Sequence, residues 1–385
     1  MKELRQNRLA ITACWLTTAL AISPAVRAET VDFVIHISVD GLHADHLRNL
    51  IDNDSTTSPK YASFKRLVVE GATTYNARTD YDLTNTLPNH TTMLTGRPAL
   101  QPTGQPNTVH HGYTFNGTPI VGQTLHNQGN PNLPYVAGVF DVAHDHGKST
   151  ALYPEKPKFE IFEQSWNLAE GAPDVTGSDD GKDKIDSYFN PATQTVHTKF
   201  VNDMRFHHFN YSFVHFFRPD NAGHGFGWGT PQWNDAVAVV DTQLGAILDL
   251  VDNDAALKNR TVVILSADHG GVGTGHGDIA DANNYTIPFF VWGPGVSAGS
   301  DLYALNALTR LDPGAGRPDY NAAVQPIRNG DGANLALNLL GLGPVPGSTI
   351  NGGQTLMVPL PTSGACAVAA LACAMVFAAR RRRGV

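Results

Sequence analysis

Cysteine is almost absent from the 385 residues of the chain. The three cysteines, Cys14, Cys366 and Cys373, all lie near the two ends, so the long stretch between them has no thiol. This absence excludes a cysteine nucleophile, a disulfide framework and a catalytic aldehyde formed from cysteine. Any metal site in this stretch must therefore use oxygen and nitrogen ligands.

Basic side chains are also scarce. The chain has 27 Lys and Arg against 35 Asp and Glu, and eight of the basic residues but only one acidic residue lie in segments 1–28 and 380–385. Residues 29–379 therefore keep 19 basic and 34 acidic side chains, a net charge of −15. Affinity for a phosphate backbone needs clustered Lys and Arg, so we do not expect nucleic acid as a partner.

Long apolar runs are missing except at the two ends. Residues 9–22 follow Lys2, Arg5 and Arg8 and precede a small-residue exit that ends at Ala28. This order predicts a secretory signal peptide over residues 1–28, and the run is short for a membrane span. We expect an exported protein that is periplasmic, attached to the cell surface or extracellular.

The C-terminal segment, residues 358–385, has the order of a sorting signal. Val-Pro-Leu-Pro precedes an apolar run at 364–379, and four arginines follow at 380–383. This order resembles the bacterial PEP-CTERM signals that exosortases process, although Leu360 stands where that family usually has Glu. A plain C-terminal membrane anchor is the alternative. Either interpretation predicts a contact with the membrane or cell surface through the tail.

Residues 29–357 are expected to form one domain without internal repeats. Apolar runs rich in Val, Ile and Phe occur at residues 33–39, 211–217, 262–265 and 287–292. Such runs are typical of strands buried on both faces of a sheet, and residues 234–251 have helical spacing. The alternation predicts an α/β fold, a three-layer sandwich with a mostly parallel central sheet flanked by helices. Residues 171–184 and 297–321 are expected to be loops.

Acidic residues and histidines follow three of these apolar runs. Ligands bind beyond the carboxyl ends of strands in such sheets, so residues that follow a strand are candidate site residues. The residues concerned are Asp40, Asp220, His224, Asp268, His269 and, seven residues later, His276. A single Asp before Gly is a common turn residue. Three such motifs at one edge of the sheet instead predict a site for zinc or a related divalent metal.

The segments VDGLHADH, TLPNH, FFRPDNAGH and ILSADHGG resemble motifs of the alkaline phosphatase superfamily. They are most similar to its type I phosphodiesterase/nucleotide pyrophosphatase branch, occur in the order of that family, and span roughly residues 30–345. The resemblance implies an alkaline phosphatase-like sandwich with two zinc ions and a threonine or serine that forms a covalent phospho-enzyme. Carried over, it implies one metal on Asp40, Thr86, Asp268 and His269, and the other on Asp220, His224 and a final histidine.

His276 is the candidate for that final histidine, although in the family this residue lies much further along the chain. No histidine follows His276, and the glycines of GTGHGD would let a short loop fold back. Asn116 lies four residues after His111-Gly112, the offset at which the family has an asparagine that binds phosphoryl oxygens. An ordinary Asn-Gly turn is the alternative for Asn116. Structural roles are expected for His43, His46, His90, His110 and His215.

Thr86 is the expected nucleophile, and a helix that begins there would point its first backbone N–H groups at the phosphate. The resemblance implies a metal-dependent hydrolase of small phosphate esters, of the phosphodiesterase or nucleotide pyrophosphatase type. An alkaline phosphatase-type monoesterase is the nearest alternative, and a catalytically inactive, surface-displayed binding protein is another. A sulfatase is excluded because TLPNH lacks the arginine of the C/S-x-P-x-R motif. Pocket and core roles both remain open for Tyr113, Phe140, Lys156, Phe226 and Trp228.

Overall fold

The computed structural model describes residues 31–174, 182–191, 195–350 and 352–358. The predicted signal peptide and all but the first residue of the predicted C-terminal tail lie outside these residues. In the part of the chain that is described, no helix is both long enough and apolar enough to cross a membrane.

An eight-stranded sheet forms the centre of the domain, in the order β4-β3-β5-β1-β6-β7-β2-β8. The strands are β1 (Phe33–Val39), β2 (Ala72–Arg78), β3 (Thr150–Pro154), β4 (Ser187–Tyr188), β5 (Tyr211–Phe216), β6 (Thr261–Ser266), β7 (Thr286–Trp292) and β8 (Ser300–Asp301). Only β7 runs antiparallel to its neighbours, so the predicted mostly parallel sheet is confirmed.

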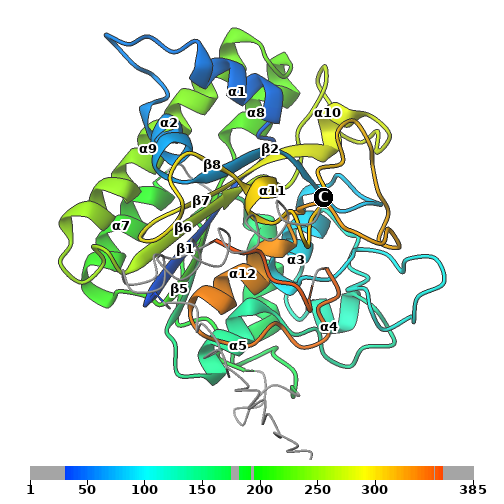
Figure 1. Ribbon diagram of the computed structural model, residues 1–385. Coiled ribbons are helices and arrows are strands. Elements are labelled where there is room, and N and C mark those ends of the chain that lie inside the picture. Colours follow the sequence, from blue (N-terminus) through cyan, green and yellow to red (C-terminus); the bar gives the residue numbers. More distant parts are fainter. Residues whose placement is uncertain (1–30, 175–181, 192–194, 351, 359–385) are drawn as a thin grey trace, which may run out of the picture.

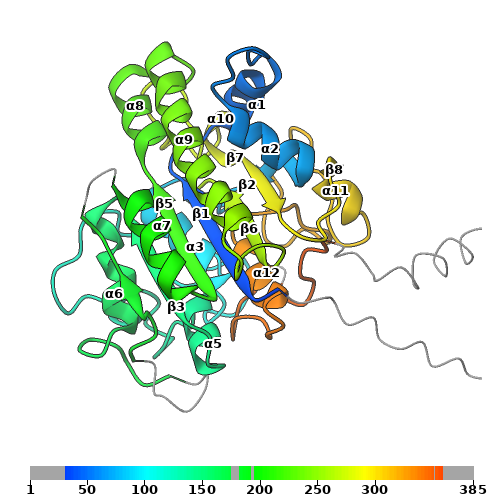
Figure 2. The same ribbon diagram turned by 90° about the vertical axis from the view of Figure 1, so that its left-hand side faces the viewer.

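Helices cover both faces of this sheet, as Figures 1 and 2 show. The helices are α1 (Ala44–Asp52), α2 (Ala62–Glu70), α3 (Thr86–Thr95), α4 (Leu125–Gln128), α5 (Val139–Asp145), α6 (Glu160–Trp166), α7 (Val196–His207), α8 (Arg218–Phe226), α9 (Pro231–Asn253), α10 (Ala282–Tyr285), α11 (Leu302–Leu305) and α12 (Asp331–Leu339). Helices α2, α7 and α9 pack together on one side, and α3, α5 and α12 on the other. The three-layer α/β sandwich predicted from the sequence is therefore confirmed.

The strands at the centre of the sheet place the candidate site. Strand β1 lies between β5 and β6, with Val39 beside Phe216 and Ser38 beside Ser266. All seven residues of β1 are buried, as expected for a strand covered on both faces. Because the three strands are parallel and in register, the residues that follow them emerge at the same edge of the sheet.

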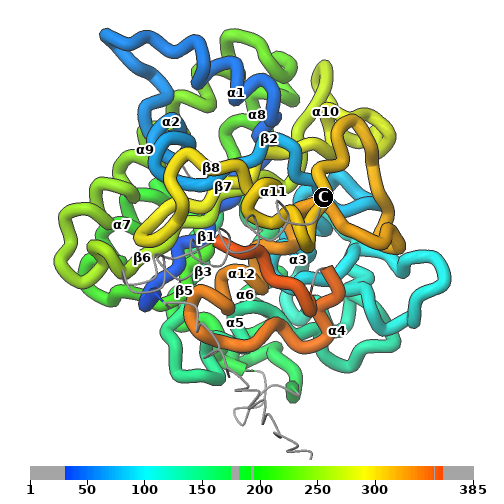
Figure 3. The backbone as a smooth tube through the Cα atoms, viewed as in Figure 1, coloured from blue at the N-terminus to red at the C-terminus, as the bar shows by residue number. Residues whose placement is uncertain are grey.

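The segment predicted as a loop at residues 297–321 is not entirely a loop. It contains β8 and the single turn of α11, because residues 300–301 pair with the outer edge of β2. Further along, orange in Figure 3, the chain returns to the segment that leads into α3. There the Tyr320 hydroxyl donates to Asp80 Oδ2 at 2.6 Å, and the Arg317 guanidinium donates to the carbonyl of Tyr81.

Candidate metal centre

Asp40, Asp268 and His269 form one buried group. None of the three is exposed to solvent, and each offers a ligand atom within 4.8 Å of the other two. His269 Nε2 lies 3.4 Å from Asp40 Oδ1 and 3.3 Å from Asp268 Oδ2. These same three atoms have no hydrogen-bond partner among the described residues. Buried polar atoms without partners are costly, so three that face one another fit a bound cation.

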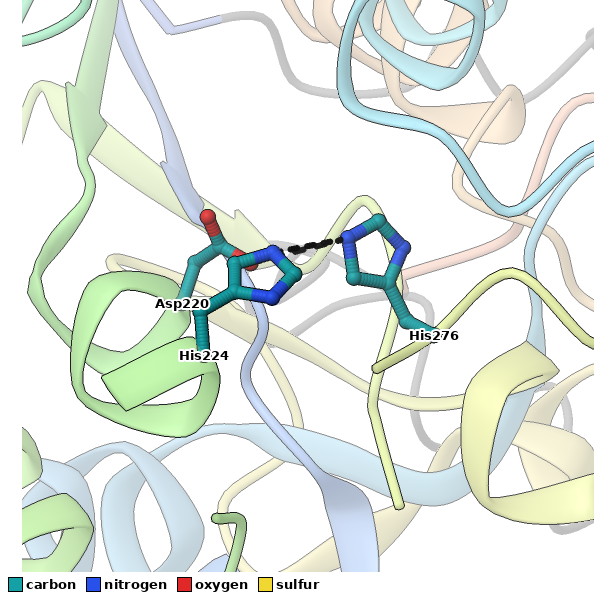
Figure 4. A group of neighbouring side chains, drawn as sticks. All are labelled: Asp220, His224 and His276. Atoms are coloured by element: carbon teal, nitrogen blue, oxygen red, sulfur yellow. Dashed lines mark hydrogen bonds and ion pairs between the residues drawn. The ribbon is translucent and has the colours of Figure 1, made fainter. Parts of the chain in front are cut away.

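Asp220, His224 and His276 form the second group, shown in Figure 4. Helix α8 carries the first two at a spacing of four residues, which places them on one helix face. His224 Nε2 lies 3.3 Å from Asp220 Oδ1 and 3.2 Å from His276 Nε2. Asp220 and His276 are buried whereas His224 is exposed, so this group is open to solvent on one side.

The hydrogen bonds of the three histidines fix which ring nitrogen faces each group. His224 Nδ1 lies 3.0 Å from the carbonyl of Thr274, His276 Nδ1 lies 2.7 Å from that of Thr84, and His269 Nδ1 bonds the carbonyl of Gly270. A carbonyl only accepts, so each Nδ1 carries the proton, and each Nε2 of a neutral ring presents a lone pair. This arrangement is typical of metal-ligating histidine. The donor sets of both groups therefore fit divalent metals.

The two groups lie side by side. The backbone N–H of Asp220 donates to the carbonyl of Asp40 at 3.1 Å, and the rings of His269 and His276 stack with centroids 3.6 Å apart. Gly41 makes this approach possible: its φ is +67°, and a Cβ there would lie 2.8 Å from Cα of Asp220. A side chain at Gly41 would push α8 away from the end of β1.

Helix α3 begins at Thr86, as the sequence predicts, and Thr86 is 2% exposed. Its neighbour Thr84 donates from the hydroxyl to the carbonyl of His276 and accepts from His276 Nδ1. On the other side, His90 Nδ1 donates to the carbonyl of Thr86 at 2.7 Å and lies 3.7 Å from Asp268 Oδ2. Hydrogen bonds and close contacts therefore connect the start of α3 with both groups, and His90 braces the turn as expected.

Asn116 and Lys158 lie beside the start of the same helix. Asn116 Oδ1 accepts a hydrogen bond from the backbone N–H of Leu87 at 2.9 Å and from Lys158 Nζ at 3.2 Å. The structure thus places Asn116 next to Thr86, and its predicted role in binding phosphoryl oxygens stays a prediction. Lys158 brings a cation to a helix N-terminus, where an anion would be stabilised by both.

Sequence reasoning missed two direct contacts of the carboxylates. Lys156 Nζ lies 2.6 Å from Asp40 Oδ2 and 2.7 Å from Asp220 Oδ2, so one ammonium group bridges the two groups. His215, expected to be structural, donates from Nε2 to Asp40 Oδ2 at 3.1 Å, while its Nδ1 accepts from the backbone N–H of Glu155. His215 follows the pattern of β5, and Lys156 follows β3, which the sequence did not reveal as a strand.

Acidic side chains crowd together at this centre and shift one another's pKa values. Burial, together with the neighbouring charge of Asp40, raises the pKa of Asp268 to about 8. Burial lowers the pKa of His269. The nearby carboxylates of Asp268, Asp40 and Asp220 outweigh this effect and raise the pKa of His269 to about 9. Burial likewise opposes the charge of Asp40, yet Lys156 and two imidazoles hold its pKa well below the usual range. Protons on Asp268 and His269 thus offset the crowded acidic groups, and divalent cations could take the place of these protons.

A cavity of about 670 Å³ lies elsewhere, between α1, β2 and the loops around residues 283, 300 and 314, and none of the predicted site residues lines it. Two of its polar side chains have partners in the cavity wall: His43 Nε2 lies 3.0 Å from Asn283 Oδ1, and Arg78 donates to the carbonyl of Gly314. Tyr113 and Phe140, once candidates for a pocket, are core residues.

Part of the chain matches the model of a known family. The sequence model of the family described as type I phosphodiesterase/nucleotide pyrophosphatase matches residues 107–287. This match and the solved structures below support the resemblance to this branch of the alkaline phosphatase superfamily that the sequence motifs predict. The match supports a phosphoester hydrolase, and the matched family typically depends on two metal ions.

Solved structures with the same fold include members of this phosphodiesterase family. Murine ectonucleotide pyrophosphatase/phosphodiesterase 5, in an inactive form in complex with AMP, is 14% identical with a TM-score of 0.54, over 82% of this chain and 96% of that chain. Human ectonucleotide pyrophosphatase/phosphodiesterase 5 is 13% identical with a TM-score of 0.53, over 82% of this chain and 96% of that chain. A Bacteroides thetaiotaomicron sulfatase from a glycosaminoglycan locus is 12% identical with a TM-score of 0.53, over 83% of this chain and 74% of that chain.

One curated relative matches a short segment of the chain. Over 89 residues, 23% of this chain, the sequence is 34% identical to GPI ethanolamine phosphate transferase 1 of Saccharomyces cerevisiae. The match covers 10% of the length of that relative.

Proposed function

We propose that the protein is an exported hydrolase of small phosphate esters that binds two divalent metal ions, zinc in preference, and reacts through a phosphorylated Thr86. The proposal rests chiefly on one observation: two facing sets of Asp and His ligand atoms lie next to the start of α3. One set would comprise Asp40, Asp268 and His269 with the Thr86 hydroxyl, and the other Asp220, His224 and His276. When bound, the ions would supply Lewis-acid activation of the hydroxyl and neutralise phosphoryl charge.

The protein groups have defined tasks in this mechanism. The Thr86 oxygen loses its proton to solvent and forms a bond to phosphorus, while the ester bond on the opposite side breaks and the alcohol portion of the substrate leaves. The first N–H groups of α3 and the side chains of Asn116 and Lys158 stabilise the phosphoryl oxygens. Water then cleaves the phospho-threonine and restores the hydroxyl. The exposed side of His224 is where substrate and water would enter.

Turnover of a substrate panel tests this function. Purified mature protein with added zinc is assayed on para-nitrophenyl phosphate, bis-para-nitrophenyl phosphate and a nucleoside 5′-monophosphate ester. We expect the diester and the nucleotide ester to be hydrolysed faster than the monoester. Exclusive monoester turnover would replace the phosphodiesterase proposal, and a zinc-loaded protein that hydrolyses none of the three would support a non-catalytic binding protein.

A phosphomonoesterase is the second candidate, and the two lysines favour it. A monoester carries one more negative charge and one more free oxygen than a diester, so it gains more from additional cationic donors. Lys156 and Lys158 bring two such donors to the centre.

Lys158→Ala measures how the lysines affect this preference. We expect the variant to lose about 100-fold in kcat/KM on the monoester, the usual effect of removing one charge-stabilising donor, and less on the diester. Lys60→Ala is the control, since Lys60 is paired with Asp235 on the surface with its side chain 64% exposed. Equal losses on both substrates would show that Lys158 does not discriminate between them.

We further propose that residues 1–28 direct export and that the tail from 358 attaches the protein to the membrane or cell surface, with exosortase processing. The basic, apolar and small-residue order of the first segment and the Pro, apolar and Arg order of the second support this. N-terminal sequencing and the intact mass of protein from a native host test it. A mature chain that still begins at Met1 would contradict the export proposal.

A further inference from the structure

Trp228 lies two residues after α8 and is 7% exposed. Its indole Nε1 donates a hydrogen bond of 2.8 Å to the carbonyl of Gly41, the residue after Asp40. Its backbone N–H donates a bond of 3.0 Å to the carbonyl of Gly273, in the loop between His269 and His276. This tryptophan is therefore bonded to two of the segments that carry candidate metal ligands.

Two glycines enclose the indole ring. A Cβ built on Gly223 would lie 2.5–2.6 Å from ring atoms Cε2, Cδ2 and Cζ2, and one built on Gly271 would lie 2.2–2.6 Å from the same three atoms. Two backbones cannot occupy the same space, so the glycines lie against opposite faces of the ring. Gly223 is the residue before His224 in α8, and Gly271 lies two residues after His269. The ring thus separates the backbones of the two groups by its own thickness.

The edges of the ring also contact candidate ligands. The His224 imidazole lies edge-on to it with centroids 5.4 Å apart, and that of His276 lies edge-on at 6.0 Å. A rigid aromatic ring at this place restricts the rotation of both imidazoles as well as the position of their backbones.

We propose that Trp228 is a positioning residue that fixes the distance between the two candidate metal groups. It acts through the backbone next to Asp40, the backbone of α8 and the loop after His269, and it binds neither metal nor substrate itself. This inference rests on the proposed two-metal function. Contacts that orient metal ligands commonly change metal affinity by about 10- to 100-fold when they are lost.

A pair of alanine substitutions in one helix tests the packing of the ring. Gly223→Ala places a methyl group against the indole, whereas a Cβ on Gly225 would meet no atom within 4 Å. Alanine is a better helix residue than glycine at both positions, so α8 itself is not weakened. We expect Gly223→Ala to retain zinc about 10-fold or more less tightly in a chelator competition, and Gly225→Ala to retain it as the wild type does.

A pair of tryptophan substitutions tests the residue itself. Trp228→Phe removes the bond to Gly41 and leaves a smaller ring between the glycines. Trp233→Phe is the matched control, because Trp233 is fully buried, contacts the ring of His46 and has an indole nitrogen without a partner among the described residues. Both variants are expected to melt at lower temperature, and only Trp228→Phe is expected to lose zinc affinity by about 10-fold or more.

Zinc titration of activity separates positioning from other roles. For Trp228→Phe and Gly223→Ala we expect excess zinc to restore kcat, with KM close to that of the wild type. Wild-type zinc retention in both variants would overturn the inference, as would an equal loss of affinity in Trp233→Phe. If the wild-type protein itself retains no zinc, the proposed two-metal function fails, and that result is distinct from a failure that is confined to the variants.

Discussion

Thr86→Ala is expected to lower kcat/KM by about 1,000-fold or more, with the fold intact. Thr86 begins α3, and hydrogen bonds and close contacts connect this helix start with both candidate metal groups. Without its oxygen no covalent phospho-enzyme can form. Steady-state kinetics on the best substrate of the panel measure the loss. Rapid acid quenching followed by peptide mass spectrometry should find one phosphoryl group on the peptide that contains Thr86 in the wild type.

Thr91→Ala provides the comparison within the same helix. Thr91 is also buried, but its hydroxyl donates to the carbonyl of Leu87 inside α3 at 2.9 Å. We expect this variant to retain turnover close to that of the wild type and to lose only stability. Thr86→Ser, which keeps a hydroxyl, should retain more activity than Thr86→Ala. Turnover by Thr86→Ala within about tenfold of the wild type would contradict a role as the nucleophile.

Removal of metal by a chelator is expected to abolish turnover, and added zinc to restore it. The facing atoms of Asp40, Asp268 and His269 have no hydrogen-bond partner in the described structure, so removal of a metal leaves these buried atoms unsatisfied. A ligand present at 100 times its dissociation constant stabilises a protein by about 2.7 kcal/mol, which raises Tm by about 4 °C in a domain of this size. Calorimetry of chelated and zinc-loaded protein measures this shift. Full activity of protein that contains no metal would exclude the mechanism.

The stabilisation by zinc should increase with pH. Folding raises the pKa of Asp268 to about 8 and that of His269 to about 9, so the chelated folded state holds protons that the unfolded chain releases at lower pH. The chelated protein therefore loses stability as the pH rises from about 4 to about 9. The same protons must leave before zinc binds, so zinc affinity rises over this interval. Melting curves from pH 6 to pH 9 should show a widening gap between the two forms, and a constant gap would contradict the assignment of these ligands.

The sequence predicts those strands of the fold that are buried on both faces, because such strands are continuously apolar. Strands β1, β6 and β7 appear as continuous apolar runs because helices cover both faces of the sheet. Strand β2 reads ATTYNAR and β3 is a five-residue TALYP, so neither has a run long or apolar enough to be recognised. The missed β3 is the reason that Lys156, which follows it, was not placed beside Asp40 and Asp220.

Candidate ligands could be predicted because they follow strands that the sequence reveals. The structure gathers Asp40, Asp268 and His269 in one group and Asp220, His224 and His276 in another, and their roles as ligands stay predictions. Contacts between residues that are far apart in the sequence could not be predicted in the same way. The environment of Trp228 depends on three loops that meet only in the folded domain, and no local pattern marks that meeting.

The grouping of Asp40 with Asp268, and of both beside Asp220, has a consequence for a domain that lacks thiols and that we propose to be exported. These residues lie 180 and 48 positions apart along the chain, at the ends of three different strands. A cation held between them would act as a cross-link across long loops, the task that disulfides perform in many secreted proteins. Such a cross-link can form only after the central strands have paired, so uptake of metal would mark the completion of folding. Loss of the metal would allow local opening at this edge of the sheet. The opened segments would then be accessible to proteases.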